Sequence, residues 1–518
     1  MFVYIVAAIL VALAIYNYFQ ARNSIFKRLQ IPGPEPSIVS GNLSEFFNKT
    51  PLALQLQKWT RQYGKTYGYM EGGRPVLVTS DLDVLHDVFV KKFSSFHGRK
   101  EFVLARDPDK TAEVHLFAAR GLRWKRLRTI VGPTFSSAKL KQIIPTMKMS
   151  VDKLIEVFEE KADKGEEFNI HRSYQEMTLD VIAKVAFGET RNFIDIPEKD
   201  NEYLKLCRSI FEEVTPRFLA FTWMANCFIE LRSVVVALLR LTALWARPAF
   251  FKITGRLKNL VDERRKIKDE YNGRMDFIQL FLEAEADPNF EYQQETSVDV
   301  LAKGKAVKVE KKLTPEEIVT NCALFLLAGY DTTSNSLAYC TYLLATNPEY
   351  QDRLREEIND FWNGDPETLT YEAMRKMTLM ENVLMETLRM YPLAAIASAR
   401  TCMSACIAGG EKIPQGLIVQ SDVWSIHYDK EVWGEDADLF RPERFAERDY
   451  HPMAWQPFGA GPRLCIGKRF ALMEEKLLLC NLLTRFRIRT CEKTQIPLKI
   501  VGFTTNSPES VFVKLERL

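Results

Sequence analysis

The stretch FGAGPRLCIG, residues 458–467, places one cysteine, Cys465, among three glycines and a proline. The segment after it, KRFALMEEKLLLCNLLTRF, has apolar residues at helical spacing, so we expect Cys465 in a loop at a helix N-terminus. Backbone N–H groups and the helix dipole stabilise an anion there, which lowers the pKa of a thiol and favours the thiolate. Such a thiolate is either a nucleophile or a metal ligand.

The rest of the chain offers few partners for this thiolate. The chain has nine cysteines and six histidines, and no two cysteines form a C-x-x-C pair, so a zinc ribbon or thioredoxin-like site is not indicated. The odd number and wide spacing indicate free thiols in the reducing cytosol. His427 and His451 lie in no motif that supplies a base for a nucleophile. One axial cysteine is sufficient to hold a haem iron, so the sequence favours a haem-binding loop.

The segment AGYDTTS, residues 328–334, breaks the rules of a long apolar helix with a glycine, an aspartate and paired threonines. The Thr332 hydroxyl can donate to the carbonyl four residues earlier and open a notch in the helix. Gly329 would let a large group approach the backbone, and Asp331 with Thr332 would pass protons to a bound ligand. The alternative is a helix kink whose polar pair is satisfied internally.

The segment RWKRLR, residues 123–128, places Trp124 and Arg128 one helical turn apart. An indole N–H and a guanidinium on one face can jointly bind an anionic oxygen group, such as a haem propionate. Arg99, Arg400 and Arg463 are further isolated arginines that can join them. The alternative is an ordinary basic helix with a packed tryptophan.

A third group of charges lies in ETLR and PERF, residues 386–389 and 442–445. Glu386 and Arg389 share a helix face at i and i+3, which on a surface contributes little. Their apolar neighbours indicate partial burial, where an ion pair needs further partners. Arg444 is the candidate partner.

The N-terminus can fix the protein to a membrane. Residues 2–16 are uninterruptedly apolar, and basic residues follow this run but do not precede it. We expect a single transmembrane anchor over residues 1–20, with the rest of the chain on the cytosolic side. A cleaved signal peptide is less favoured, because the basic n-region is missing. A proline-rich linker, with IPGPEP at residues 31–36, follows over residues 21–50.

Residues 51–518 are expected to form one body, mainly α with a smaller β part. The pattern predicts a β-hairpin around Gly72 and Gly73, a helix capped by Ser80, and a helix that begins with a capping box of Thr314 and Glu317 and ends before Pro348. A polar surface loop is expected over residues 286–313.

Charge and hydropathy limit the partners of this body. The balance of 70 Lys+Arg against 67 Asp+Glu gives no signature of nucleic-acid binding. The apolar stretch over residues 217–251 is either a pair of core helices or a pair that enters the membrane interface.

These motifs resemble the cytochrome P-450 family of haem-thiolate monooxygenases over nearly the whole chain. FGAGPRLCIG matches the family's cysteine loop F-x-x-G-x-x-x-C-x-G, and AGYDTT matches its oxygen-activating helix. ETLR with PERF matches the charged triad, and WKRLR matches the haem-contact helix W-x-x-x-R. WKRLRTIVGPTFSSAKLK, RFALMEEKLLL and KTQIPLK look like the microsomal animal branch that contains drug-metabolising enzymes and thromboxane synthase.

The resemblance implies a haem b cofactor and a role for each residue. The axial ligand would be Cys465, beside Phe458. Propionate contacts would come from Trp124, Arg128 and Arg463, with a less close match at Arg99 and Arg400. Proton delivery would fall to Asp331 and Thr332, and a structural triad would consist of Glu386, Arg389 and Arg444.

The activity implied is a monooxygenase of the endoplasmic reticulum membrane that acts on a lipophilic substrate. Electrons would come from NADPH through a flavoprotein reductase, with cytochrome b5 as a further donor. The reductase would bind a basic face formed by Lys125, Arg126, Lys468 and Arg469. A reductase-independent isomerase of lipid peroxides and a non-catalytic haem protein are the alternatives.

Overall fold

The computed structural model describes residues 1–46, 51–211, 216–243, 249–267, 276–285, 311–362, 368–447, 450–502 and 504–518. The helices are α1 (Phe2–Asn23), α2 (Ile25–Arg28), α3 (Leu52–Tyr63), α4 (Leu82–His86), α5 (Gly121–Val131), α6 (Ser137–Asp163), α7 (Ile170–Phe187), α8 (Glu202–Phe211), α9 (Pro216–Cys227), α10 (Arg232–Ala243), α11 (Ala249–Lys266), α12 (Phe277–Glu283), α14 (Pro315–Thr346), α15 (Glu349–Phe361), α16 (Tyr371–Lys376), α17 (Thr378–Met390), α18 (Val423–His427), α19 (Lys430–Trp433), α20 (Arg444–Glu447) and α21 (Lys468–Leu483).

The strands are short. They are β1 (Thr66–Glu71), β2 (Arg74–Thr79), β3 (Gly98–Arg99), β4 (Glu167–Asn169), β5 (Ala399–Thr401), β6 (Cys406–Ala408), β7 (Glu411–Ile413), β8 (Ile418–Ser421), β9 (Phe486–Arg489), β10 (Ile500–Val501), β11 (Ser507–Pro508) and β12 (Phe512–Arg517). The predicted class, mainly α with a smaller β part, is confirmed. The expected polar loop falls mostly on residues 286–310, which lie outside the described residues.

The largest sheet has the strand order β1-β2-β8-β5-β3. Its first two strands form the predicted hairpin, and Gly72 in the turn has φ +63°, a conformation that favours glycine. At the other edge, β3 and β5 pair antiparallel, with Arg99 directly opposite Arg400. The sheet thereby brings together two arginines that are 301 positions apart in the chain.

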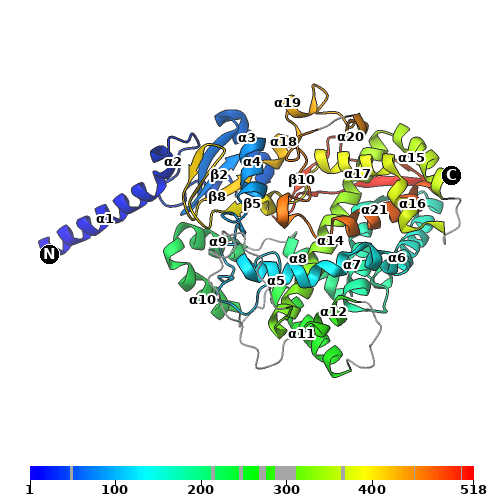
Figure 1. Ribbon diagram of the computed structural model, residues 1–518, viewed down its shortest axis with the longest axis horizontal. Helices are drawn as coiled ribbons and strands as arrows, with labels where there is room; N and C mark the ends of the chain where they lie inside the picture. Colours follow the sequence, from blue (N-terminus) through cyan, green and yellow to red (C-terminus); the bar gives the residue numbers. More distant parts are fainter. Residues whose placement is uncertain are drawn as a thin grey trace.

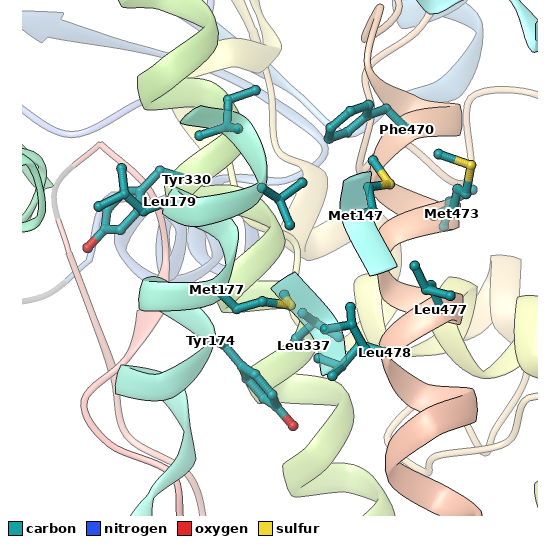
Figure 2. Packing of buried hydrophobic residues seen from close by; sticks show 14 of the residues in the cluster. Met147, Tyr174, Met177, Leu179, Tyr330, Leu337, Phe470, Met473, Leu477 and Leu478 are labelled. Atoms are coloured by element: carbon teal, nitrogen blue, oxygen red, sulfur yellow. The ribbon is translucent and has the colours of Figure 1, made fainter. Parts of the chain in front are cut away.

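The helical core is built around α14, which packs along α7 and against α21. Figure 2 shows this packing, with Met177 and Tyr174 of α7, Leu337 of α14 and Leu478 of α21 turned toward one another. The Tyr174 hydroxyl lies 2.8 Å from the Thr341 hydroxyl, which satisfies both polar groups inside the core. The helix that carries the AGYDTTS segment is therefore held on several sides by apolar contacts.

The ends of α14 follow the sequence prediction. The Glu317 backbone N–H donates to the Thr314 hydroxyl at 3.3 Å, and the Thr314 N–H donates to the Glu317 carboxylate at 3.1 Å. The helix ends at Thr346, before Pro348.

The cap of α4 differs from the prediction, because Asp81, one residue beyond Ser80, accepts from the N–H groups of Asp83 and Val84.

Helix α1 projects from the body (left in Figure 1) and has a mean hydropathy of 2.2 over its most apolar window. Its length and composition suit a membrane span, and 6% of that window is buried. Its last turn contacts the body, because Arg22 donates to the carbonyls of Cys227 at 2.8 Å and Val39 at 3.0 Å. Helix α1 is thus joined to the end of α9.

The proline-rich linker packs on the sheet. The Gly68 N–H of β1 donates to the Pro32 carbonyl at 2.8 Å. A Cβ on Gly33 would lie 1.9 Å from the Gly68 carbonyl oxygen, so this close approach requires glycine.

The apolar stretch over residues 217–251 forms α9, α10 and the start of α11, with residues 244–248 outside the described part. On and just before α10, Leu231, Val234, Leu238 and Leu241 follow at helical spacing and are each about half exposed or more. The interpretation of this pair as core helices is therefore wrong for α10, whose apolar stripe faces outward. In Figure 1, α9 and α10 lie near the end of the molecule from which α1 projects.

Two adjacent carboxyl groups are buried on α21. Burial raises the pKa of Glu475 to about 8, although a hydrogen bond from Ser336 of α14 opposes the shift. Burial and the neighbouring Glu475 raise the pKa of Glu474 as well. The Glu475 carboxyl is therefore mostly protonated in the folded protein at neutral pH and below.

We predict that Glu475 makes the folded state less stable as pH rises. Below about pH 4 the group is protonated in both states, whereas between about 4.5 and 8 only the unfolded chain loses its proton. The free energy of unfolding should fall by an amount on the order of 4 kcal/mol across this window. Denaturant titrations from pH 5 to 9 should show a flatter profile for Glu475→Gln. The exposed Glu356, changed to Gln, should keep the wild-type profile, and an unchanged slope in Glu475→Gln would contradict the assignment.

Candidate active site

The cysteine loop is built as the sequence predicts. Gly467 is the N-cap residue of α21, two positions after Cys465, and the Cys465 N–H donates to the Phe458 carbonyl at 2.9 Å. Gly461 has φ +67°, and a Cβ there would lie 2.0 Å from the Phe89 carbonyl oxygen. The loop therefore depends on glycine where it crosses the segment after α4.

The predicted low pKa of the Cys465 thiol is wrong for the protein alone. Burial raises this pKa, and it outweighs the N–H groups of Gly467 and Lys468 and the charges of Arg128 and Arg99, all of which lower it. Part of the Cys465 residue is nevertheless exposed. The loop thus supplies several groups that favour the thiolate. An additional cation at the sulfur would lower the pKa of the thiol further.

Four arginines from four parts of the chain converge at this loop, and one of them, Arg463, belongs to the loop itself. Arg99 of β3 donates to the Arg463 carbonyl, and Arg128 of α5 donates to the Leu464 carbonyl, each at 3.0 Å. Arg463 itself is 3% exposed and donates to the carbonyls of His97, Phe117 and Ala119.

Arg400 and Trp124 complete the group. Arg400 is 1% exposed beside Arg99, and its guanidinium lies 4.3 Å from the centre of the Phe89 ring. The Arg463 guanidinium lies 4.8 Å from the centre of the Trp124 ring. The structure therefore unites all five residues that the sequence proposed for propionate binding, including Arg99 and Arg400, whose local motifs were less specific.

The electrostatics of this cluster fit a bound dianion. Burial and then mutual repulsion lower the pKa of Arg400 and Arg463, and burial lowers that of Arg99 to about 10. Among the described residues, no carboxylate pairs with Arg99, Arg128, Arg400 or Arg463, and the buried Nε atoms of Arg99, Arg400 and Arg463 have no hydrogen-bond partner. Buried donors of one charge sign require an anion, so the cluster fits the two carboxylates of a haem.

On α14, Thr332 adopts the predicted bond. Its hydroxyl donates to the Ala328 carbonyl at 2.7 Å, four residues earlier. Ala328 is exposed and Thr332 partly exposed, although their helix neighbours Tyr330 and Thr333 are buried. One face of this otherwise buried helix is therefore accessible.

Asp331 points to a different set of partners from Thr332. Its carboxylate accepts from Thr505 at 2.6 Å and from Asn335 at 3.0 Å, and Asn335 also donates to Ser507 at 3.0 Å. These bonds link the helix to the hairpin of β10 and β11. The sequence analysis missed Thr505 and Ser507, which lie in no motif, whereas Asn335 could have been found from its i+4 spacing to Asp331.

Gly329 has a different environment from the one expected. A Cβ there would lie 3.1 Å from the Ile182 side chain of α7. The close approach that the structure shows at this glycine is therefore helix packing, and its assignment to cofactor binding gains no support.

A cavity of about 580 Å³ lies next to the hairpin of β10 and β11. Its lining includes Phe211 of α8, Thr222 of α9, Ile396, Val501 of β10 and Ser507 of β11. Most of its accessible surface is apolar, and its wall includes the hairpin that holds Asp331. The cavity suits an organic molecule that is largely apolar.

The charged triad is fully buried behind the cysteine loop. Glu386 bonds to Arg389 at 2.6 Å and to Arg444 at 2.9 Å, and none of the three side chains is exposed. Arg389 also donates to the His427 carbonyl, and Arg444 donates to the Trp433 carbonyl at 3.0 Å. The predicted triad therefore has the further partners that a buried ion pair needs.

The predicted basic face must be corrected at Arg126. This side chain is 3% exposed and lies 2.6 Å from the buried carboxylate of Glu317 on α14. It therefore joins α5 to α14, while Arg469 is exposed and Lys125 and Lys468 are partly exposed.

The chain is similar to proteins of known family along nearly its full length. A family model described as Cytochrome P450 matches residues 31–513. In Caenorhabditis elegans, cytochrome P450 CYP13A3 is 38% identical over 522 residues, which cover 99% of this chain and 98% of the relative. CYP13A2 is 38% identical over 512 residues, with 97% and 96% covered, and CYP13A5 is 39% identical over 512 residues, with 95% and 94% covered. Since the match extends from the proline-rich linker to the last strand, the chain belongs to the cytochrome P450 family of haem-thiolate monooxygenases.

Proposed function

We propose that this chain is a membrane-anchored monooxygenase that inserts one atom of dioxygen into a lipophilic substrate, with electrons from NADPH delivered by a flavoprotein reductase. The observation that carries this proposal is the convergence of the Cys465 loop with four arginines that have no acidic partner in the described part of the chain. Bound haem b with a thiolate ligand supplies the activation of dioxygen. Cys465 would bind its iron, and the arginine cluster with Trp124 would hold its propionates.

The accessible face of α14 supports a role in proton delivery. Thr332 presents its hydroxyl oxygen at this face while its proton is held by the Ala328 carbonyl. The Asp331 carboxylate is oriented by Thr505 and Asn335, so it can exchange a proton with the hydroxyl groups of the C-terminal hairpin. We propose that the Thr332 hydroxyl oxygen would hold a proton donor at this face and that Asp331 would supply protons to the site through this network.

The surface around the cysteine loop supports the reductase as partner. Lys125, Lys468 and Arg469 lie on α5 and α21, the two helices that flank the loop, and would attract an acidic flavoprotein or cytochrome b5. The Lys468 ammonium lies 4.9 Å from the centre of the Trp455 ring, so its charge rests on an aromatic face beside the loop.

The outward apolar stripe near α1 supports attachment to the endoplasmic reticulum membrane with the body on the cytosolic side. The stripe on α10 would enter the interface beside the anchor, since exposed leucine and valine at helical spacing suit a headgroup boundary. A lipophilic substrate dissolved in the bilayer would then reach the cavity between α9 and the sheet.

We predict that Cys465→Ala abolishes the red-shifted Soret band of the reduced, carbon-monoxide-bound protein, because that band requires a thiolate ligand. Cys491→Ala, which removes another partly exposed thiol, should keep it. Survival of the shifted band in Cys465→Ala would refute the axial assignment.

Turnover of a lipid hydroperoxide without NADPH or reductase would favour an isomerase instead.

We predict that Thr332→Ala lowers product formation by about 10-fold or more, since a positioned proton donor contributes this much or more to a rate. Hydrogen peroxide released per NADPH consumed should rise in parallel. Thr505→Val should change both quantities in the same direction and by less, because it loosens Asp331 without removing it. Thr346→Ala is the matched control, because its hydroxyl also donates to the carbonyl four residues earlier on α14 but far from the site. Equal peroxide release in all variants would contradict the role of Thr332.

We predict that the double change Lys125→Glu and Arg469→Glu slows the reduction of this protein by its reductase about 10-fold at low salt. The reason is that attraction between a basic face and an acidic partner speeds their encounter. High salt should reduce the difference through screening. Lys164→Glu, at the far end of α6, should behave as wild type. Stopped-flow reduction rates that do not change in the double variant at low salt would remove this face from the proposed contact.

A further inference from the structure

Two cysteines outside the haem-binding loop lie together at the edge of the arginine cluster. Cys402 directly follows β5, which carries Arg400, and Cys406 is the first residue of β6. Cys406 is paired with Ile413 of β7, and the Cys402 sulfur lies 3.6 Å from the carbonyl oxygen of that same Ile413. Both cysteines belong to one apolar cluster, and a side-chain hydrogen bond joins the two thiols.

The electrostatics also show that the two thiols interact. Burial raises the pKa of Cys402 to about 12, and the charge and side-chain hydrogen bond of Cys406 raise it as well. The two groups differ in access, because Cys402 is buried and Cys406 is partly exposed. One accessible thiol beside one covered thiol is the arrangement of a reactive cysteine and the cysteine that resolves it.

We propose that Cys402 and Cys406 form a reversible disulfide when the protein meets hydrogen peroxide. The Cys406 thiolate attacks one peroxide oxygen, the O–O bond breaks, and sulfenic acid and one water form after protonation. The Cys402 sulfur then attacks the sulfenyl sulfur, the S–O bond breaks, and the oxygen leaves as a second water. Two thiols lose two electrons in total, and one hydrogen peroxide takes them up. This inference does not depend on the proposed substrate or reductase.

The turn between the two cysteines contacts the segment that carries Arg99. The Met403 N–H donates to the Ser95 carbonyl at 2.7 Å, and the Ser404 hydroxyl donates to the Ser95 hydroxyl at 3.0 Å. A Cβ on Gly98 would lie 2.7 Å from the Met403 sulfur, so this turn packs tightly on β3. A disulfide would close a short ring around the turn and thereby restrict local opening of the strands that hold Arg99 and Arg400.

The direct test uses the full-length haem-loaded protein and limited hydrogen peroxide, followed by alkylation of free thiols under denaturing conditions. Both cysteines lie in one tryptic peptide, residues 401–412. This peptide should lose the mass of two hydrogen atoms and escape alkylation, and dithiothreitol should restore both thiols. Cys491→Ser should show the same linked peptide, whereas Cys406→Ser should leave Cys402 open to alkylation.

The proposal is overturned if peptide 401–412 carries two alkylated cysteines, or a sulfinic acid at Cys406, after treatment that already oxidises Cys491. A second measurement tests the consequence for the haem site. After oxidation with glutathione disulfide, transfer of haem to apomyoglobin should slow by about threefold or more in the wild type, because the ring restricts local opening. Transfer from the double variant Cys402→Ala/Cys406→Ala should be insensitive to this treatment. Equal transfer rates from the linked and reduced wild type would refute the coupling to the arginine cluster.

Discussion

Mutual repulsion among Arg99, Arg128, Arg400 and Arg463 is the constraint on which the site depends. Burying one cation without a partner costs several kcal/mol, and these four lie within electrostatic reach of one another. Main-chain carbonyls accept hydrogen bonds from some of the arginine N–H groups. The free-energy cost of burying the four cations is therefore shared by β3, β5, α5 and the cysteine loop. An anion at this point therefore stabilises all four elements together, and cofactor binding becomes part of the folding free energy.

In contrast to the arginine cluster, the buried triad contains its own carboxylate. Glu386 is shared by Arg389 and Arg444, and both arginines also bind main-chain carbonyls, so the group is complete without a ligand. Removing one member of a buried ion group costs about 3–5 kcal/mol, because it leaves an unpaired charge inside the protein. The triad thus stabilises the region behind the loop without a ligand, whereas the arginine cluster keeps unpaired donors that an anion can bind.

The sequence was sufficient to predict features that depend on residues close together in the chain. The capping box of Thr314 and Glu317, the turn at Gly72 and the bond from Thr332 to Ala328 each depend on residues within four positions, and all three are confirmed. It was insufficient where distant segments meet. Arg126 was expected at the surface, but it is buried and bonds to the Glu317 carboxylate, 191 positions away. Thr505 contacts Asp331 from a hairpin that carries no motif. The thiol pKa was misjudged because helix-end effects of about 1 kcal/mol cannot offset burial, which shifts pKa values by up to about 3–5 units.

The hydrogen bonds from Arg22 to the end of α9 have a mechanical consequence. They join α1 to α9, which lines the cavity, so a displacement of α1 is passed to the cavity wall. If α1 spans a bilayer as proposed, the depth of the cavity in that bilayer would follow the hydrophobic thickness of the surrounding lipid. Lipid composition would then affect which solutes reach the cavity.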